Sequence, residues 1–184
     1  MKVLAISGSL RSGSYNTTLL RAAAEVAPED VEVVLYDGLK AIPPYDEEDD
    51  TDIAPAAVAD FRDAIARADA ILFATPEYNG SIPGVLKNAL DWASRPFATN
   101  ALRNKPVTVV GASTGGFGAV WAQADLRRVL KTIGARVVGE EVPVPAVHTR
   151  TDEAGRLADA ETEERLREVL DALAEAVEAR LVAA

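Results

Sequence analysis

The chain has 184 residues, of which 48% are hydrophobic and 26% are charged. Length and composition of this kind predict one folded domain over residues 1–184 and exclude a disordered chain. Lysine and arginine number 19 against 29 aspartate and glutamate residues, so the net charge is −10. Such a charge opposes binding to nucleic acid phosphates and to anionic membranes, and neither partner is expected.

The chain contains no cysteine. This excludes disulfides, thiolate metal sites, cysteine-bound iron–sulfur clusters and a cysteine nucleophile. The first apolar run ends at Gly8, too early for a signal peptide, and no later run approaches the roughly 18 residues of a membrane span. A cytoplasmic protein is therefore predicted.

Short apolar runs alternate with amphipathic segments along the chain. They predict strands at 3–6, 31–36, 70–74, 107–110 and 135–138, and helices that begin at Asn16, Pro55 and Pro83 and that span 119–134 and 161–181. The connection 37–54 is longer than most loops, which indicates a functional or mobile segment. Pro143 and Pro145 are expected to end the sheet.

Strands that alternate with helices predict an α/β fold, with a three-layer, doubly wound sheet of five parallel strands in the order 2-1-3-4-5. The segments richest in glycine, serine and asparagine are 8–16, 76–81 and 111–118, and each directly follows a predicted strand. Ligands of such sheets bind at the carboxyl ends of the strands. The three segments are therefore expected to meet at one rim and to form a ligand site.

The first loop, 8–16, has the groups that bind a phosphate. Backbone amides at a helix amino terminus attract an anion, and Arg11 can add a charged contact. Ser14 stands where a nucleoside triphosphate loop has lysine, and the dinucleotide motif Gly-x-Gly-x-x-Gly is missing. A monophosphate therefore fits best. The alternative is a structural turn in which Ser14 or Asn16 only caps the helix.

The second and third loops suit a flat heterocycle. Prolines bracket Tyr78 and Asn79 in the second loop, which predicts a stiff turn whose peptide groups can hydrogen-bond the polar edge of a ring. Tyr78 can cover a face of that ring; the alternative is that Tyr78 packs in the core. Glycines of the third loop, 111–118, allow a ligand to approach the backbone closely.

Three stretches of sequence carry a family resemblance. They are Gly-Ser-Leu-Arg-x-x-Ser-x-Asn from Gly8, Pro-Glu-Tyr-Asn-Gly-Ser-x-Pro-Gly-x-Leu-Lys-Asn-Ala-Leu-Asp-Trp from Pro76, and Ser-Thr-Gly-Gly from Ser113. Together they resemble the NADPH-dependent FMN reductase family, in its branch of quinone, azo and chromate reductases. The second stretch is the most specific, and the likeness extends from Met1 to about Gly134.

The resemblance implies a flavodoxin-like fold over 1–184 with noncovalent FMN, NADPH or NADH as electron donor, a small-molecule acceptor, and a homodimer or homotetramer. In this family FMN takes a hydride and passes two electrons on, so that no catalytic acid is required. One departure from the family pattern is Ala119, where many relatives have a further glycine.

The resemblance also assigns three groups of site residues. Ser9, Arg11, Ser14 and Asn16 would hold the FMN phosphate; Pro76, Glu77, Tyr78 and Asn79 would flank the ring; and Ser113, Thr114, Gly115 and Gly116 would support it.

Other residues indicate sites less strongly. His148 is the only histidine, which excludes a multi-histidine metal site. The acidic run 46–52 lacks the glycine and final glutamate of an EF-hand loop and is expected to be solvated. Trp92 and Trp121 are candidates to cover the flavin or a subunit interface, with core packing as the alternative. Glu77 is a candidate proton donor.

The sequence leaves two alternatives to an oxidoreductase. One is a nonenzymatic FMN carrier or electron-transfer module with the same fold, and the other is a regulatory or binding domain without FMN. Oxidation of NAD(P)H separates the enzyme from the carrier, and stabilisation by added FMN separates both from the FMN-free domain.

Overall fold

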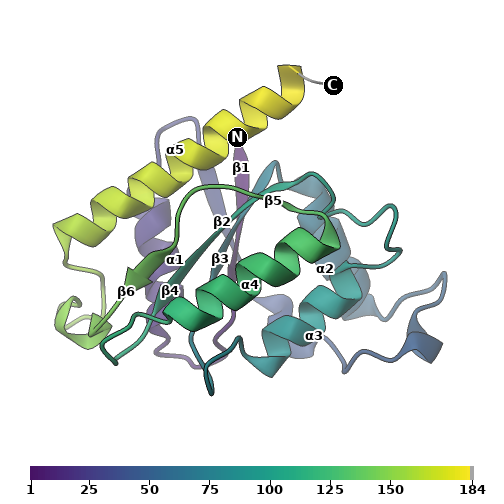
Figure 1. The fold of residues 1–184 in the computed structure, drawn as a ribbon, viewed down its shortest axis with the longest axis horizontal. Coiled ribbons are helices and arrows are strands. Elements are labelled where there is room, and N and C mark those ends of the chain that lie inside the picture. Colours follow the sequence, from purple (N-terminus) through teal and green to yellow (C-terminus); the bar gives the residue numbers. More distant parts are fainter. Residues whose placement is uncertain (183–184) are drawn as a thin grey trace.

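A computed structural model describes residues 1–182 (Figure 1). Its strands are β1 (Lys2–Ser7), β2 (Glu32–Tyr36), β3 (Ala70–Ala74), β4 (Pro106–Ala112), β5 (Arg136–Val137) and β6 (Val142–Val144). Its helices are α1 (Tyr15–Glu25), α2 (Ala56–Arg67), α3 (Gly84–Ala93), α4 (Val120–Ile133) and α5 (Ala160–Val182), with short 3₁₀ turns η1 (Gly38–Ala41), η2 (Glu47–Asp49) and η3 (Val147–Thr149).

The sheet has the predicted order β2-β1-β3-β4-β5, and every pair is parallel. Val3 of β1 is the register partner of both Val33 and Ala70, so β1 lies between β2 and β3. The connection from β2 crosses over β1 to reach β3, and this reversal of direction is where doubly wound sheets bind ligands. The flavodoxin-like fold is thus confirmed.

The expectation that Pro143 ends the sheet is wrong, whereas Pro145 directly follows the last strand, as expected. Pro143 lies in β6, which pairs in parallel with the end of β4 in the register Gly111↔Pro143. Ser113 N–H donates to the carbonyl of Val144, so the backbone of Val144 faces β4. Because successive residues of a strand alternate in direction, the backbone of the preceding residue, Pro143, faces away from β4. Because proline lacks only its own N–H, it is tolerated in an edge strand at a position that faces outward.

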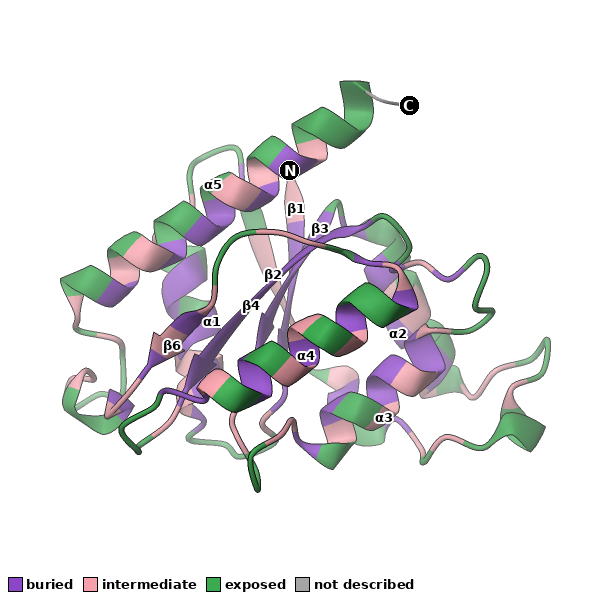
Figure 2. Ribbon diagram, viewed as in Figure 1, coloured by how far each residue is buried: buried purple, intermediate pink, exposed green. Residues whose placement is uncertain are grey.

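Helices cover both faces of the sheet (Figure 1, Figure 2). Leu4 and Ile6 of β1 pack with α2, α3 and α4, whereas Val3 and Ala5 pack with α1 and α5. All five residues of β3 are buried, as expected of a strand covered on both faces. The sheet therefore forms the middle of three layers, and its strand ends are held rigidly.

Trp92 packs in the core, which confirms the alternative to a role in covering the flavin or an interface. Its side chain is fully buried. Its indole N–H donates to the Pro43 carbonyl at 2.9 Å. Asn88 donates to the same carbonyl, and Arg62 pairs with Asp50 at 2.9 Å. The segment 37–54 is therefore anchored to α2 and α3 at these points.

Each helix start differs from the prediction by one residue. Pro55 and Pro83 are the residues before α2 and α3, α4 begins one residue after the predicted start, and α1 and α5 begin one residue before theirs. None of the helices within residues 1–182 combines the length and the apolarity that crossing a membrane requires.

Candidate functional site

The three predicted loops meet at the carboxyl ends of β1, β3 and β4, at the lower rim in Figure 1. They enclose a space of about 210 Å³, here called the loop cleft. The residues that line it are Ser9, Arg11, Ser14, Tyr15, Asn16, Pro76, Glu77, Tyr78, Ala112, Ser113 and Thr114. Of the predicted site residues, Asn79, Gly115 and Gly116 do not line the cleft.

The first loop presents unused hydrogen-bond donors to the cleft. Within residues 1–182, the backbone N–H groups of residues 10–16 donate to no protein acceptor. The Arg11 guanidinium lies 5.3 Å from the ring centre of Tyr15, which holds it beside these amides. Amides at the start of α1 together with a guanidinium are the groups that bind a phosphate.

Ser14 and Asn16 both have structural partners. The Ser14 hydroxyl accepts from Thr17 N–H at 3.2 Å and caps α1. The buried Asn16 amide pairs with both backbone groups of Ala112: its Oδ1 accepts from the N–H at 3.0 Å and its Nδ2 donates to the carbonyl at 3.1 Å. Asn16 therefore ties the first loop to the third.

The second loop is a tight hairpin turn. Tyr78 and Ser81 exchange both backbone hydrogen bonds, at 2.9 and 3.2 Å. The residues between them, Asn79 and Gly80, have φ of +54° and +76°, the conformation of a type I′ turn. Tyr78 is 53% exposed, so the alternative that it packs in the core is wrong. Asn79 lies at the tip of the turn.

Two side chains fasten the second loop to α4. Glu77 Oε2 accepts from the N–H groups of Trp121 and Ala122, both at 3.1 Å. It thereby pairs two N–H groups of the first turn of α4 that have no acceptor within the helix. The Ser81 hydroxyl donates to Asp125 Oδ2 at 2.5 Å. This hydrogen bond, followed by that from Arg128, holds the pKa of the Asp125 carboxyl below its usual value. The loop therefore has a fixed position beside the cleft.

The third loop combines close packing with open backbone. Gly118 has φ of +59°, and a Cβ added there would lie 2.5 Å from the backbone nitrogen of Val144, so only glycine fits. A Cβ added at Gly116 would meet nothing within 4 Å, so the backbone at this position is not covered by other parts of the protein. Ala119 adopts a left-handed φ of +60°, the conformation for which glycine is better suited.

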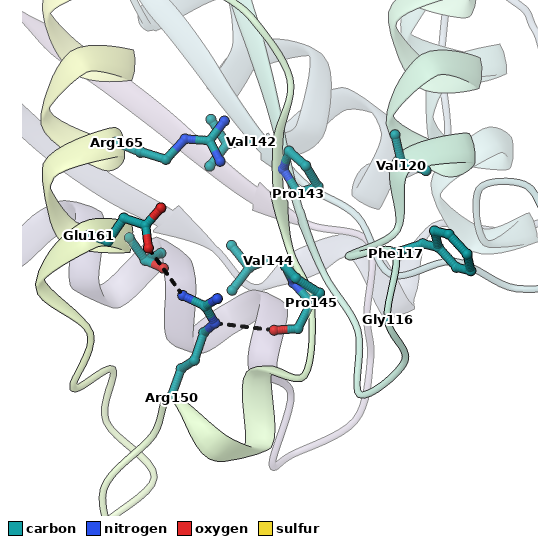
Figure 3. A pocket seen from close by; sticks show the side chains of 11 residues that line it. Gly116, Phe117, Val120, Val142, Pro143, Val144, Pro145, Arg150, Glu161 and Arg165 are labelled. Atoms are coloured by element: carbon teal, nitrogen blue, oxygen red, sulfur yellow. Dashed lines mark hydrogen bonds and ion pairs between the residues drawn. The ribbon is translucent and has the colours of Figure 1, made fainter.

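A neighbouring space of about 380 Å³, here called the α5 cavity, lies beside the third loop (Figure 3). Gly116 and Phe117 border it. Its two arginines already have partners: Arg150 pairs with Asp159 at 2.6 Å, and Arg165 donates to the Glu141 carbonyl at 2.9 Å. The cations of the α5 cavity are therefore engaged by the protein itself.

Sequence reasoning missed two residues that shape the site. The buried Gln123 of α4 donates to the Gly118 carbonyl and accepts from Val142 N–H, both at 3.0 Å, and so joins the third loop to β6. A polar residue within the apolar stripe of α4 was the available signal. Asp125, the partner of Ser81, gives no such signal because it lies on a partly exposed face.

Comparison with known proteins agrees with this geometry. The family model described as NADPH-dependent FMN reductase matches residues 1–149. An NAD(P)H-dependent FMN reductase of Pseudomonas aeruginosa is 44% identical over 94% of this chain and 93% of its own length. A 2-hydroxy-1,4-benzoquinone reductase of a Burkholderia species is 37% identical over 99% of both chains. The chain belongs to the NADPH-dependent FMN reductase family.

A solved structure supports the same assignment. The flavoenzyme FerB of Paracoccus denitrificans, an NAD(P)H:(acceptor) oxidoreductase, superposes with a TM-score of 0.86 at 34% identity. The match covers 96% of this chain and 97% of FerB.

Proposed function

We propose that this protein is an NAD(P)H-dependent FMN oxidoreductase that passes two electrons from NAD(P)H to a quinone or a similar small acceptor. The observation that carries the proposal is the loop cleft, where the unused amides of residues 10–16 and Arg11 lie at the point at which the sheet reverses direction. The relatives named as FMN and quinone reductases support the choice of cofactor and acceptor.

The residues of the cleft fit FMN. The amides and Arg11 would bind the phosphate, and the hydroxyl of Ser9 would add a further donor, because it has no hydrogen-bond partner within residues 1–182. When bound, FMN accepts a hydride and releases two electrons to an acceptor. All further steps that the protein controls concern binding and orientation.

The second and third loops would bind and orient the ring. Pro76 and Tyr78 line the cleft, and the exposed Tyr78 ring is free to cover one face of a flat ligand. Ser113 and Thr114 of the third loop line the cleft, and backbone amides near the ring would stabilise negative charge. Since Glu77 Oε2 is engaged by two amides of α4, we assign Glu77 to positioning rather than to proton donation.

The test is oxidation of NADPH by the FMN-loaded protein with a benzoquinone as acceptor. The proposal expects NADPH consumption well above that of free FMN at equal concentration. Binding of FMN without oxidation of NADPH or NADH would instead identify an electron carrier. A protein that neither binds FMN nor gains thermal stability from it would refute both.

Other expectations stay predictions of the sequence. They are a cytoplasmic location, a homodimer or homotetramer, and activity toward azo compounds and chromate. The oligomeric state is measurable by light scattering, and the acceptor range by the same NADPH assay with each oxidant in turn.

A further inference from the structure

Two aromatic side chains are exposed together at the rim of the sheet, beside the loop cleft. Phe117 of the third loop is 65% exposed and Trp121 of α4 is 51% exposed, so Trp121 does not pack in the core. Their ring centres lie 4.9 Å apart, and the rings are tilted by 56°. We call Phe117 and Trp121 the aromatic pair. Large apolar side chains that share an exposed position mark binding surfaces.

The backbone between the two residues is strained so that it brings them together. The N–H of Val120 donates to the Phe117 carbonyl at 3.2 Å, and the residues between them, Gly118 and Ala119, have φ of +59° and +60°. This turn folds Phe117 back onto the first turn of α4. Alanine is disfavoured in the left-handed conformation, and backbone strain of this kind is concentrated at functional sites.

The aromatic pair is continuous with the loop cleft. Glu77 lines the cleft, and its Oε2 accepts from the N–H of Trp121 at 3.1 Å. Phe117 follows Thr114, another residue of the cleft, by three positions. The Phe117 ring points away from Arg150, which lies across the α5 cavity (Figure 3). The pair therefore borders the cleft on its α4 side.

The charges near the pair disfavour an anion. The Glu77 carboxylate lies beside Trp121, and Asp125 follows one turn later in α4. Arg128 is already paired with Asp125 at 2.6 Å. The chain as a whole has a net charge of −10, which repels anions. A neutral, flat, apolar ring therefore fits these surroundings better than a compact anion.

We propose that the aromatic pair binds the electron acceptor and favours neutral acceptors with fused rings, such as a naphthoquinone, over single-ring quinones and compact anionic oxidants. This inference rests on the proposed function. One ring of the acceptor would lie in the loop cleft, and the second ring would pack against Phe117 and Trp121. An acceptor with a single ring lacks the part that reaches the pair.

Acceptor kinetics of the FMN-loaded protein test this role. At saturating NADPH, Trp121→Ala is expected to lower kcat/KM for 1,4-naphthoquinone about tenfold, chiefly by raising KM, and kcat/KM for 1,4-benzoquinone by no more than about twofold. Trp121→Phe should restore most of the loss, because it keeps an aromatic ring at this position. Phe117→Ala is expected to change the two quinones in the same sense as Trp121→Ala.

The matched control is Phe97→Ala, since the Phe97 side chain is also 51% exposed. Asn100 donates to the carbonyls of both Phe97 and Ile133, the last residue of α4. Phe97 therefore lies at the opposite end of α4 from Trp121, and its removal should leave the kinetics of both quinones unchanged.

A binding measurement makes the test independent of turnover. Calorimetry on the FMN-loaded protein without NADPH uses 2-naphthol and phenol, which do not oxidise the flavin. We expect 2-naphthol to bind at least about tenfold more tightly than phenol, with the difference lost in Trp121→Ala and kept in Phe97→Ala.

Three results would overturn the proposal. They are equal losses for the two quinones in Trp121→Ala, a naphthol preference that Trp121→Ala leaves unchanged, and a change from oligomer to monomer in Trp121→Ala with unchanged acceptor kinetics. The last result would mean that a second copy of the chain covers the pair. If the wild type reduces neither quinone, the proposed function fails, whereas the naphthol measurement still judges the aromatic pair.

Discussion

Replacing Asn16 by alanine tests whether this residue builds the site or binds the ligand directly. The substitution removes two hydrogen bonds, of 3.0 and 3.1 Å, from the backbone of Ala112. Asn16 is 3% exposed and Ala112 is 2% exposed, so water cannot readily replace the amide. Each buried group without a partner costs about 1–3 kcal/mol. Two such groups remain in the flavin-free variant, which is therefore expected to lose about 2–6 kcal/mol of unfolding free energy, measured by urea denaturation.

Ser9→Ala is the matched control, because the Ser9 hydroxyl has no hydrogen-bond partner in residues 1–182. This variant should keep its unfolding free energy within about 0.5 kcal/mol and bind FMN more weakly. If Asn16→Ala instead behaves like Ser9→Ala, with unchanged stability and only weaker FMN binding, then the contact with Ala112 contributes nothing and Asn16 acts on the phosphate.

Three further predictions concern binding, packing and titration. Arg11→Ala should raise the FMN dissociation constant at least tenfold, since a charge-assisted hydrogen bond contributes about 1.5–3 kcal/mol; an unchanged fluorescence titration would contradict this. Gly118→Ala should destabilise the protein by about 2 kcal/mol or more, because its φ is positive and the new Cβ meets backbone. Gly116→Ala, in open space, is the control, and equal melting temperatures for the two would disprove the argument. Burial and the nearby Asp60 raise the pKa of Tyr36 from 10.0 to about 12, so the folded state keeps a proton that the unfolded chain releases. The resulting stabilisation is complete below pH 10.0 and is lost as the pH rises toward 12; Asp60→Asn should lower the pH at which phenolate absorbance appears, and an unshifted titration would argue against the contact.

Local pattern was sufficient for most of the fold. The apolar run 70–74 predicts β3 to the residue, and Gly134 ends α4 with a left-handed φ of +99° as its position after the helix suggests. The site loops were predictable because each follows a strand in a parallel sheet, and topology alone brings such loops together.

What the sequence did not reveal depends on contacts between distant residues. The role of Asn16 is fixed by Ala112, which lies 96 positions later. The strand β6 depends on pairing with β4, which allows Pro143 to face outward. Glu77 resembles a free loop carboxylate until α4 is placed beside it. In each case the partner is set by tertiary packing, which no local periodicity encodes.

The break between β5 and β6 has a consequence for how the protein behaves at high concentration. Unpaired carbonyls on a sheet margin can recruit a strand from another molecule and begin a fibril. Here Arg127 from α4 donates to the Gly139 carbonyl at 2.7 Å, and Arg165 from α5 donates to the Glu141 carbonyl at 2.9 Å. Two guanidinium groups, one from each helical layer, thus occupy two carbonyls between β5 and β6, and a strand that paired there would have to displace them.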